Sequence, residues 1–194
     1  LYWRLEYRNF NGTFKPAYYN KMYDRTRGDY VNDIITYLED QSNPQYDVHT
    51  MGIYGQAGFK IKKVMSFEGG YFWPWYRDAA TDEIMMGEDD FLHLKATLEP
   101  GVIPVVDISG SVAYDRTKFI PTLLGSGDPA EELKLFDANT VVTAELIYPV
   151  APTLDVALLY TTALARDADG NVVYDANGNP DVATTVSIET RVHF

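Results

Sequence analysis

Apolar and polar residues alternate strictly over several segments of this chain, and this alternation governs which folds are open to it. In the last eleven residues, TTVSIETRVHF, the valine, isoleucine and phenylalanine side chains occupy one parity, and serine, glutamate, arginine and histidine occupy the other. Successive side chains of a strand point to opposite faces. The segment is therefore predicted to be a strand with one apolar face and one charged face.

The same alternation recurs in eight segments, and the connections between them alternate between short and long. Tight turns at one end and long loops at the other are typical of an up-and-down antiparallel β-barrel. The predicted strands are residues 1–10, 46–61, 65–77, 90–98, 104–116, 134–148, 154–166 and 182–194. The short turns lie near residues 62–63, 100–101 and 150–151, and the long loops are 11–45, 78–89, 117–133 and 167–181.

Each short turn predicts a strand register, because only some pairings place like faces together. Pairing Ile61 with Met65 sorts both faces of the first hairpin cleanly. For the second hairpin we expect Leu98 opposite Pro104, and for the third Tyr148 opposite Leu154. The second register also sets four polar side chains near one another, with Lys95 opposite Asp107 and His93 opposite Ser109.

Composition removes several classes of protein. The chain of 194 residues suits one domain, spanning residues 1–194. A formal charge of -12 disfavours nucleic acid as a partner, since phosphates require a basic surface. The chain has no cysteine, and no apolar run long enough for a transmembrane helix. It begins at Leu1 without a leader, so we expect a mature form or a fragment.

Alternation alone does not decide which face points inward. Soluble barrels bury the apolar face, whereas membrane barrels turn it towards lipid and enclose the charged face. Aromatic side chains near the strand ends and the unequal loops favour the membrane arrangement. The expected interface aromatics are Trp3, Trp73, Trp75, Tyr76, Tyr114, Tyr148 and Phe194. The expected lumen residues are Arg4, Glu6, Arg8, Lys60, Glu68, Lys95, Asp107, Glu145, Glu189 and Arg191.

The alternating end of the chain resembles the C-terminal assembly signal of bacterial outer-membrane β-barrel proteins. That signal ends in an aromatic residue preceded by apolar residues at alternate positions, here Val186, Ile188, Thr190, Val192 and Phe194. Thr190 departs from the pattern, because an aromatic or aliphatic residue is more usual there. The resemblance implies location in the outer membrane, recognition by the barrel-assembly machinery, and outer-membrane lipid and lipopolysaccharide as surroundings.

Candidate chemistry is sparse. His93 with Ser109 and Asp107 is a weak candidate for a lipid-modifying site, and a polar network of the lumen explains these residues more simply. The loop 167–181 carries possible calcium ligands, although its Asp-Gly and Asn-Gly dipeptides favour plain turns. A short helix is expected within residues 31–38 of the longest loop. The calcium candidates are Asp167, Asp169, Asn171, Asp175, Asn177, Asn179 and Asp181.

We therefore expect a non-enzymatic outer-membrane barrel of about eight strands, without a cofactor. It is either a structural barrel with a charged interior or, as the C-terminal portion of a larger barrel, a porin-like channel with acidic external loops. The alternatives are a soluble β-barrel or β-sandwich that binds small molecules, and an outer-membrane enzyme that modifies lipid.

Overall fold

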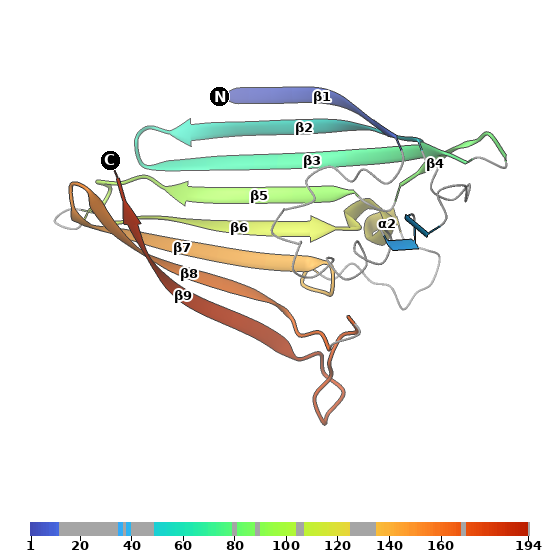
Figure 1. Cartoon of the computed structure of the whole chain (residues 1–194). Coiled ribbons are helices and arrows are strands. Elements are labelled where there is room, and N and C mark those ends of the chain that lie inside the picture. Colours follow the sequence, from blue (N-terminus) through green and yellow to red (C-terminus); the bar gives the residue numbers. More distant parts are fainter. Residues whose placement is uncertain are drawn as a thin grey trace.

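The chain forms one antiparallel, up-and-down β-sheet (Figure 1). The computed structural model describes residues 1–11, 35–36, 38–39, 49–78, 81–87, 90–103, 107–124, 135–167 and 170–193. The order of strands is β1-β2-β3-β5-β6-β7-β8-β9, with β4 paired to β3 off this path. The elements are β1 (Tyr2–Asn11), β2 (His49–Ile61), β3 (Met65–Arg77), β4 (Ile84–Met86), β5 (Phe91–Leu98), β6 (Ser109–Thr117), α2 (Phe119–Leu124), β7 (Thr140–Ala151), β8 (Leu154–Leu164) and β9 (Val182–Val192).

All eight predicted strands are present, and the all-β class, the antiparallel pairing and the up-and-down order are confirmed. The strand predicted at 65–77 has the bounds of β3. Two short elements lie in predicted loops, namely β4, which pairs antiparallel with the last three residues of β3, and the short helix α2 after β6. Residues 35–36 and 38–39 are helical, within the longest predicted loop. Among the described residues, no helix is both long and apolar enough to cross a membrane.

The register of the β2–β3 hairpin is confirmed. Ile61 pairs with Met65, and the pairing continues without a shift to Thr50 and Tyr76. The turn is tight because Lys62 adopts a left-handed backbone, with φ of 51°, and the Val64 N–H donates to the Ile61 carbonyl over 3.1 Å. A turn of this length leaves one register that sorts both faces.

The predicted register of the β5–β6 hairpin is wrong. Leu98 pairs with Gly110 and not with Pro104, so β6 begins at Ser109, after Asp107. The connection is longer than predicted; it includes Gly101 in the left-handed region, with φ of 77°, and Glu99, whose N–H donates to the Val64 carbonyl. The displacement is an even number of residues, so the two faces stay sorted and the alternation did not reveal it.

The predicted register of the β7–β8 hairpin is wrong by two residues. Tyr148 pairs with Val156 and not with Leu154, and the register shifts between Pro149 and Ala151. Proline has no N–H to donate to the ladder and is found at bulges and edges. Pro149 therefore accounts for the irregularity that displaces this turn.

The paired strands present two rows of side chains, which differ in burial. The charged row is the face of the sheet that carries Glu6, Glu68, Asp115 and Arg191. The apolar row is the opposite face, formed by the alternate residues of each strand. Crowding is greatest on the charged row, where Phe72, Ala113, Asp115, Val141, Ala157 and Ala163 are buried. Large side chains of the apolar row are exposed: Trp3, Leu5, Tyr7, Ile53, Phe59, Ile61, Trp73, Leu94, Val112, Leu146, Tyr148, Leu158, Tyr160, Val182, Val186, Ile188 and Val192.

The sheet is open along β1 and β9 in the part of the chain that the structure describes. We predicted a closed barrel, but β1 pairs only with β2 and β9 only with β8. Both chain ends lie at the end of the sheet that carries the short turns (Figure 1). Each edge strand thus keeps one side of its backbone without a ladder partner.

Candidate functional site

The charged row holds three groups of polar side chains, and the first lies on β1. Arg4 and Arg8 both form ion pairs with Glu6, which stands between them, and the Arg8 guanidinium is 2.8 Å from the Glu6 carboxylate. Arg8 also lies over two rings, 4.2 Å from the centroid of Tyr54 and 5.4 Å from that of Phe72. Stacking and ion pairing together hold the Arg8 side chain against the sheet.

A second group runs from β1 to β6. The Tyr2 hydroxyl donates a hydrogen bond to Glu68, and Glu68 lies 3.8 Å from Nε2 of His93. His93 Nδ1 is 2.6 Å from the carboxylate of Asp115, which is 2% exposed. The predicted partner Asp107 is absent from this group, because the register of β6 brings Asp115 opposite His93. Asp115 was not predicted as the partner of His93, because the predicted register of β6 was shifted.

The third group spans β7 to β9. Arg191 contacts Glu145 over 2.6 Å, reaching across β8, and contacts Glu189 over 3.1 Å. At the short-turn end, His193 Nε2 lies 2.7 Å from Asp155. In this open sheet Glu189 thus contacts Arg191, its neighbour on the same face of β9.

The three remaining predicted lumen residues, Lys60, Lys95 and Asp107, lie outside these three groups. Lys60, in the charged row, forms an ion pair with Glu99 over 3.2 Å beside the short turns. Lys95 lies in the same row opposite Ala113 and next to Glu68 on β3. Asp107 precedes β6 and is therefore not part of the row.

Most of the predicted interface aromatics lie on the apolar row. Trp3 and Tyr148 are 74% and 49% exposed near the short turns, and Trp73 and Trp75 form an edge-to-face pair towards the long loops. Tyr76 lies on the charged row, with its hydroxyl 3.7 Å from the sulfur of Met85.

The last strand presents the motif residues on the apolar row: Val186, Ile188, Thr190 and Val192 are exposed along β9, and Phe194 lies outside the described residues.

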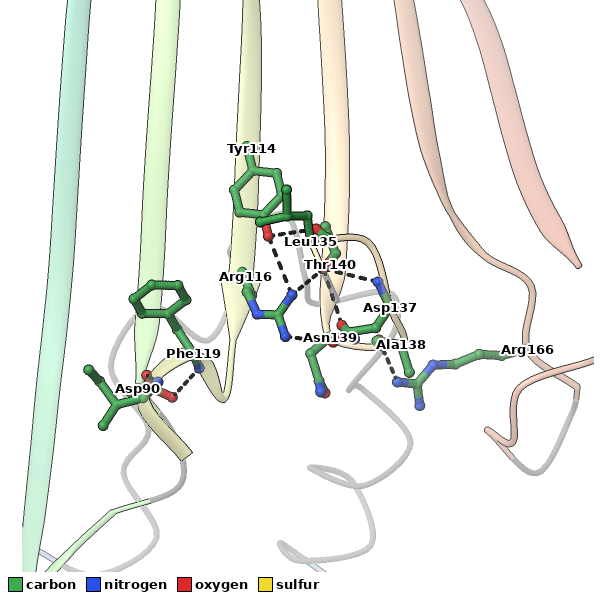
Figure 2. Close-up of polar contacts among 11 residues, drawn as sticks. Asp90, Tyr114, Arg116, Phe119, Leu135, Asp137, Ala138, Asn139, Thr140 and Arg166 are labelled. Atoms are coloured by element: carbon green, nitrogen blue, oxygen red, sulfur yellow. Dashed lines mark hydrogen bonds and ion pairs between the residues drawn. The ribbon is translucent and has the colours of Figure 1, made fainter. Parts of the chain in front are cut away.

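Polar side chains replace the apolar row at the loop end of β6 and β7, where they form hydrogen bonds with residues 135–140 (Figure 2). Arg116 is 1% exposed, and its guanidinium lies 2.5 Å from Asp137 and donates to the Thr140 hydroxyl over 3.3 Å. The Tyr114 hydroxyl donates to the Leu135 carbonyl over 2.7 Å. Arg166, which follows the end of β8 by two residues, donates to the Ala138 carbonyl over 3.0 Å. These contacts form a clasp, residues 114–116 with 135–140, that fastens the loop before β7.

Asp90 is the second buried polar group at this end. Its carboxylate accepts hydrogen bonds from the N–H groups of Phe119 and Ile120, at 3.0 and 2.8 Å, and from the Tyr71 hydroxyl at 2.8 Å. Burial raises the pKa of Asp90, while these hydrogen bonds act in the opposite direction. The carboxylate caps the start of α2 and joins it to β3, which is a structural arrangement.

The described residues of the last loop include two tight turns. Asp167 accepts a hydrogen bond from the Asn171 N–H, and Asp175 accepts from the N–H groups of Asn177 and Asn179. The backbone N–H bonds lower the pKa of Asp175. Asp181 accepts from the next amide, and Asp169 lies outside the described residues. These oxygens serve the turns, and the described residues contain no group of three or more acidic or histidine side chains placed to hold a metal.

The structure does not bring Ser109 to His93. Ser109 pairs with Ile147 at the short-turn end of β6, whereas His93 faces Asp115 near the other end. A nucleophile needs its base within hydrogen-bond reach, so these two residues do not form a catalytic pair.

Comparison with family models, curated proteins and solved structures finds no match for this chain. The interpretation of the two rows therefore depends on their own physical chemistry.

Proposed function

We propose that this chain is an integral β-barrel protein of the bacterial outer membrane, with its apolar row in contact with lipid and its charged row enclosed. One observation carries the proposal: large apolar side chains are exposed along every long strand, while the charged row is the more buried of the two. Exposed apolar patches of this extent are rare on soluble monomers. Ionic side chains in a lumen are ordinary for membrane barrels.

The dimensions of the apolar row agree with a bilayer. On β2 the row runs from Ile61 to Met51, which at about 3.3 Å per residue is about 33 Å along the strand. A barrel strand tilted by about 40° would span about 25 Å along the membrane normal. This is the height of the apolar band of outer-membrane barrels, about 25 Å.

The contacts within the charged row favour a barrel filled by side chains rather than one with a wide pore. Its side chains already contact one another over the open sheet, as in Tyr2 with Glu68, His93 with Asp115 and Arg191 with Glu145. Eight strands enclose a space just wide enough for side chains. The proposed role is that of a structural or anchoring barrel, with the acidic loops outside the membrane.

Tryptophan emission tests the proposal. All three tryptophans, Trp3, Trp73 and Trp75, lie on the apolar row. After refolding into vesicles whose acyl chains carry bromine, we expect strong quenching of the emission, because the rings lie in lipid. Chains that keep only Trp3 or only Trp73, with phenylalanine at the other two positions, report separately on the short-turn end and the long-loop end of the apolar row.

Two controls make the result decisive. Acrylamide in the water should quench the vesicle-bound chain less than the unfolded chain. If brominated lipid leaves the emission unchanged and the chain stays monodisperse in water without detergent, the membrane proposal is overturned in favour of a soluble β-sheet protein.

A porin-like channel is the second candidate, and the open edges favour it because further strands could join there. Conductance in planar bilayers separates the two. A filled barrel should give small or flickering currents, whereas a wide channel should give large, steady currents biased towards cations by the acidic loops.

A further inference from the structure

The two open edges of the sheet carry opposite charge. On the charged row of β1, Glu6 is shared by Arg4 and Arg8, an excess of one positive charge. On the charged row of β9, Arg191 is shared by Glu189 and, from β7, Glu145, an excess of one negative charge. The net charges of the two clusters are therefore opposite and would neutralise each other if the edges met.

The strand directions allow the edges to meet. Every neighbouring pair from β1 through β9 is antiparallel, so β1 and β9 run in opposite directions and can pair antiparallel themselves. Hydrocarbon offers no partner for unpaired backbone groups, so a sheet in a membrane must close. Closure must also align the apolar rows, which restricts the register to steps of two residues.

We infer that β1 pairs with β9 of the same chain, with Leu5 opposite Val192, forming a seam that sets Glu6 against Arg191 and Arg8 against Glu189. This inference rests on the proposed function, since it is the membrane that requires closure.

The neighbouring registers fail on charge. A step of two residues one way places Glu6 opposite Glu189 and Arg4 opposite Arg191, and a step the other way places Arg8 opposite Arg191. Like charges directly opposite one another across strands are destabilising. Only the register of Leu5 with Val192 makes both ionic pairs favourable and sets Tyr7 opposite Thr190 on the apolar row.

The stagger of the existing sheet agrees with this seam. From Arg4, the paired residues lead through Gln56, Gly70, His93, Asp115, Val141 and Ala163 to Ala183 on β9. The proposed seam places Arg4 opposite His193, which directly follows β9 and lies about ten residues after Ala183. For eight strands this stagger corresponds to a strand tilt of about 40°, within the usual range of barrels.

The seam joins two groups into one network across the interior. Glu145, Arg191 and Glu189 would continue into Arg8, Glu6 and Arg4, and Arg8 remains stacked on Tyr54. An eight-stranded ring of this stagger has a backbone radius of about 8 Å, which such a network fills. The seam therefore predicts a barrel that is closed to large solutes.

Disulfide trapping tests the register, because the chain has no cysteine of its own. Leu5 and Val192 are 66% and 57% exposed and lie on the apolar row, so replacing them leaves all six ionic side chains in place. The variant Leu5→Cys with Val192→Cys is compared with two matched controls, Leu5→Cys with Thr190→Cys and Tyr7→Cys with Val192→Cys. The controls report the registers displaced by two residues in either direction.

After oxidation in vesicles, we expect the first variant to form a disulfide within one chain, at least about fivefold more than either control, because only directly opposed residues meet the distance limit. A higher yield in a control overturns the register. Disulfides only between two chains, or none in any variant, overturn the seam. Hydrogen exchange of the unsubstituted chain in vesicles needs no folding of a variant: slow exchange along β1 and β9 supports the seam, and fast exchange overturns it.

The outcome is separable from the proposed function. If brominated lipid quenches the tryptophans while no seam forms, the membrane assignment stands and the inference fails. If brominated lipid does not quench them and the chain stays monodisperse in water without detergent, the proposed function itself fails.

Discussion

Gly52 lies directly beneath the ring of Phe72 on the charged row. A Cβ at position 52 would stand 2.5 Å from Cε2 of Phe72 and 2.8 Å from the carbonyl oxygen of Trp73. Phe72 is 5% exposed, and the Trp73 oxygen belongs to the backbone. The absence of a side chain at Gly52 is therefore what allows the ring to pack against the sheet.

The first prediction follows from this contact. Gly52→Ala should destabilise the folded chain by about 1–3 kcal/mol, because the added methyl overpacks a closed space. The matched control is Gly55→Ala on the apolar row of the same strand, where the nearest atom to the new Cβ is Leu5 Cδ1 at 3.9 Å. Urea titration in detergent or vesicles measures both. Equal effects of the two substitutions would argue against the crowding of the charged row.

A second prediction concerns depth in the membrane. Val112, in the middle of the apolar row, and Val150, beside a short turn, are both 53% exposed. In a bilayer Val112→Arg should cost about 2–4 kcal/mol, whereas Val150→Arg should cost about 0–1 kcal/mol near the interface. Folding yield and urea midpoint in vesicles provide the measurement. A soluble protein would tolerate both substitutions alike, so equal stability of the two variants speaks against lipid contact.

Asp90 provides a third prediction. Asp90→Ala removes the acceptor for the N–H groups of Phe119 and Ile120 and for the Tyr71 hydroxyl. Unpaired buried donors should lower the free energy of unfolding by about 2–3 kcal/mol, measured by urea titration. Asp90→Asn keeps one oxygen acceptor, so its free energy of unfolding should lie between those of Asp90→Ala and the unsubstituted chain. An alanine variant as stable as the unsubstituted chain would show that α2 does not depend on this cap.

The clasp at the loop end gives a fourth prediction. Arg116 is buried against Asp137, so Asp137→Asn and Arg116→Met should each destabilise the fold, and the double variant by less than the sum of the two. The expected coupling in a double-mutant cycle is about 1–3 kcal/mol. Additive effects would mean that this ion pair does not hold the loop.

The fifth prediction concerns pH. The pKa of Asp175 is lowered by the backbone N–H bonds of its turn, so the folded turn holds the proton less tightly than the unfolded chain. The turn should be stable above the unfolded pKa of about 3.9 and should lose that stability as pH falls through the lower folded pKa. The NMR shifts of the Asn177 and Asn179 amides report the change. Asp175→Asn should remove the pH dependence of these shifts while keeping an oxygen acceptor. If the shifts still titrate as before, a group other than Asp175 causes the pH dependence.

The alternation of the sequence was sufficient to predict the strands and the register of one hairpin. The alternation located β3 at its observed bounds and paired Ile61 with Met65, because a tight turn joined two well-sorted faces. It also separated the charged row from the apolar row along every long strand, since side-chain parity is a property of the strand itself.

Register and burial beyond that hairpin required the folded sheet. Alternation has a period of two, so a displacement by two residues at Tyr148, or by six at Leu98, leaves both faces sorted and is invisible in the sequence. The pairing of His93 with Asp115 and the burial of Asp90 and Arg116 join residues distant along the chain. The physical reason is that parity assigns each side chain to a face, whereas long connections and packing between strands select its partner.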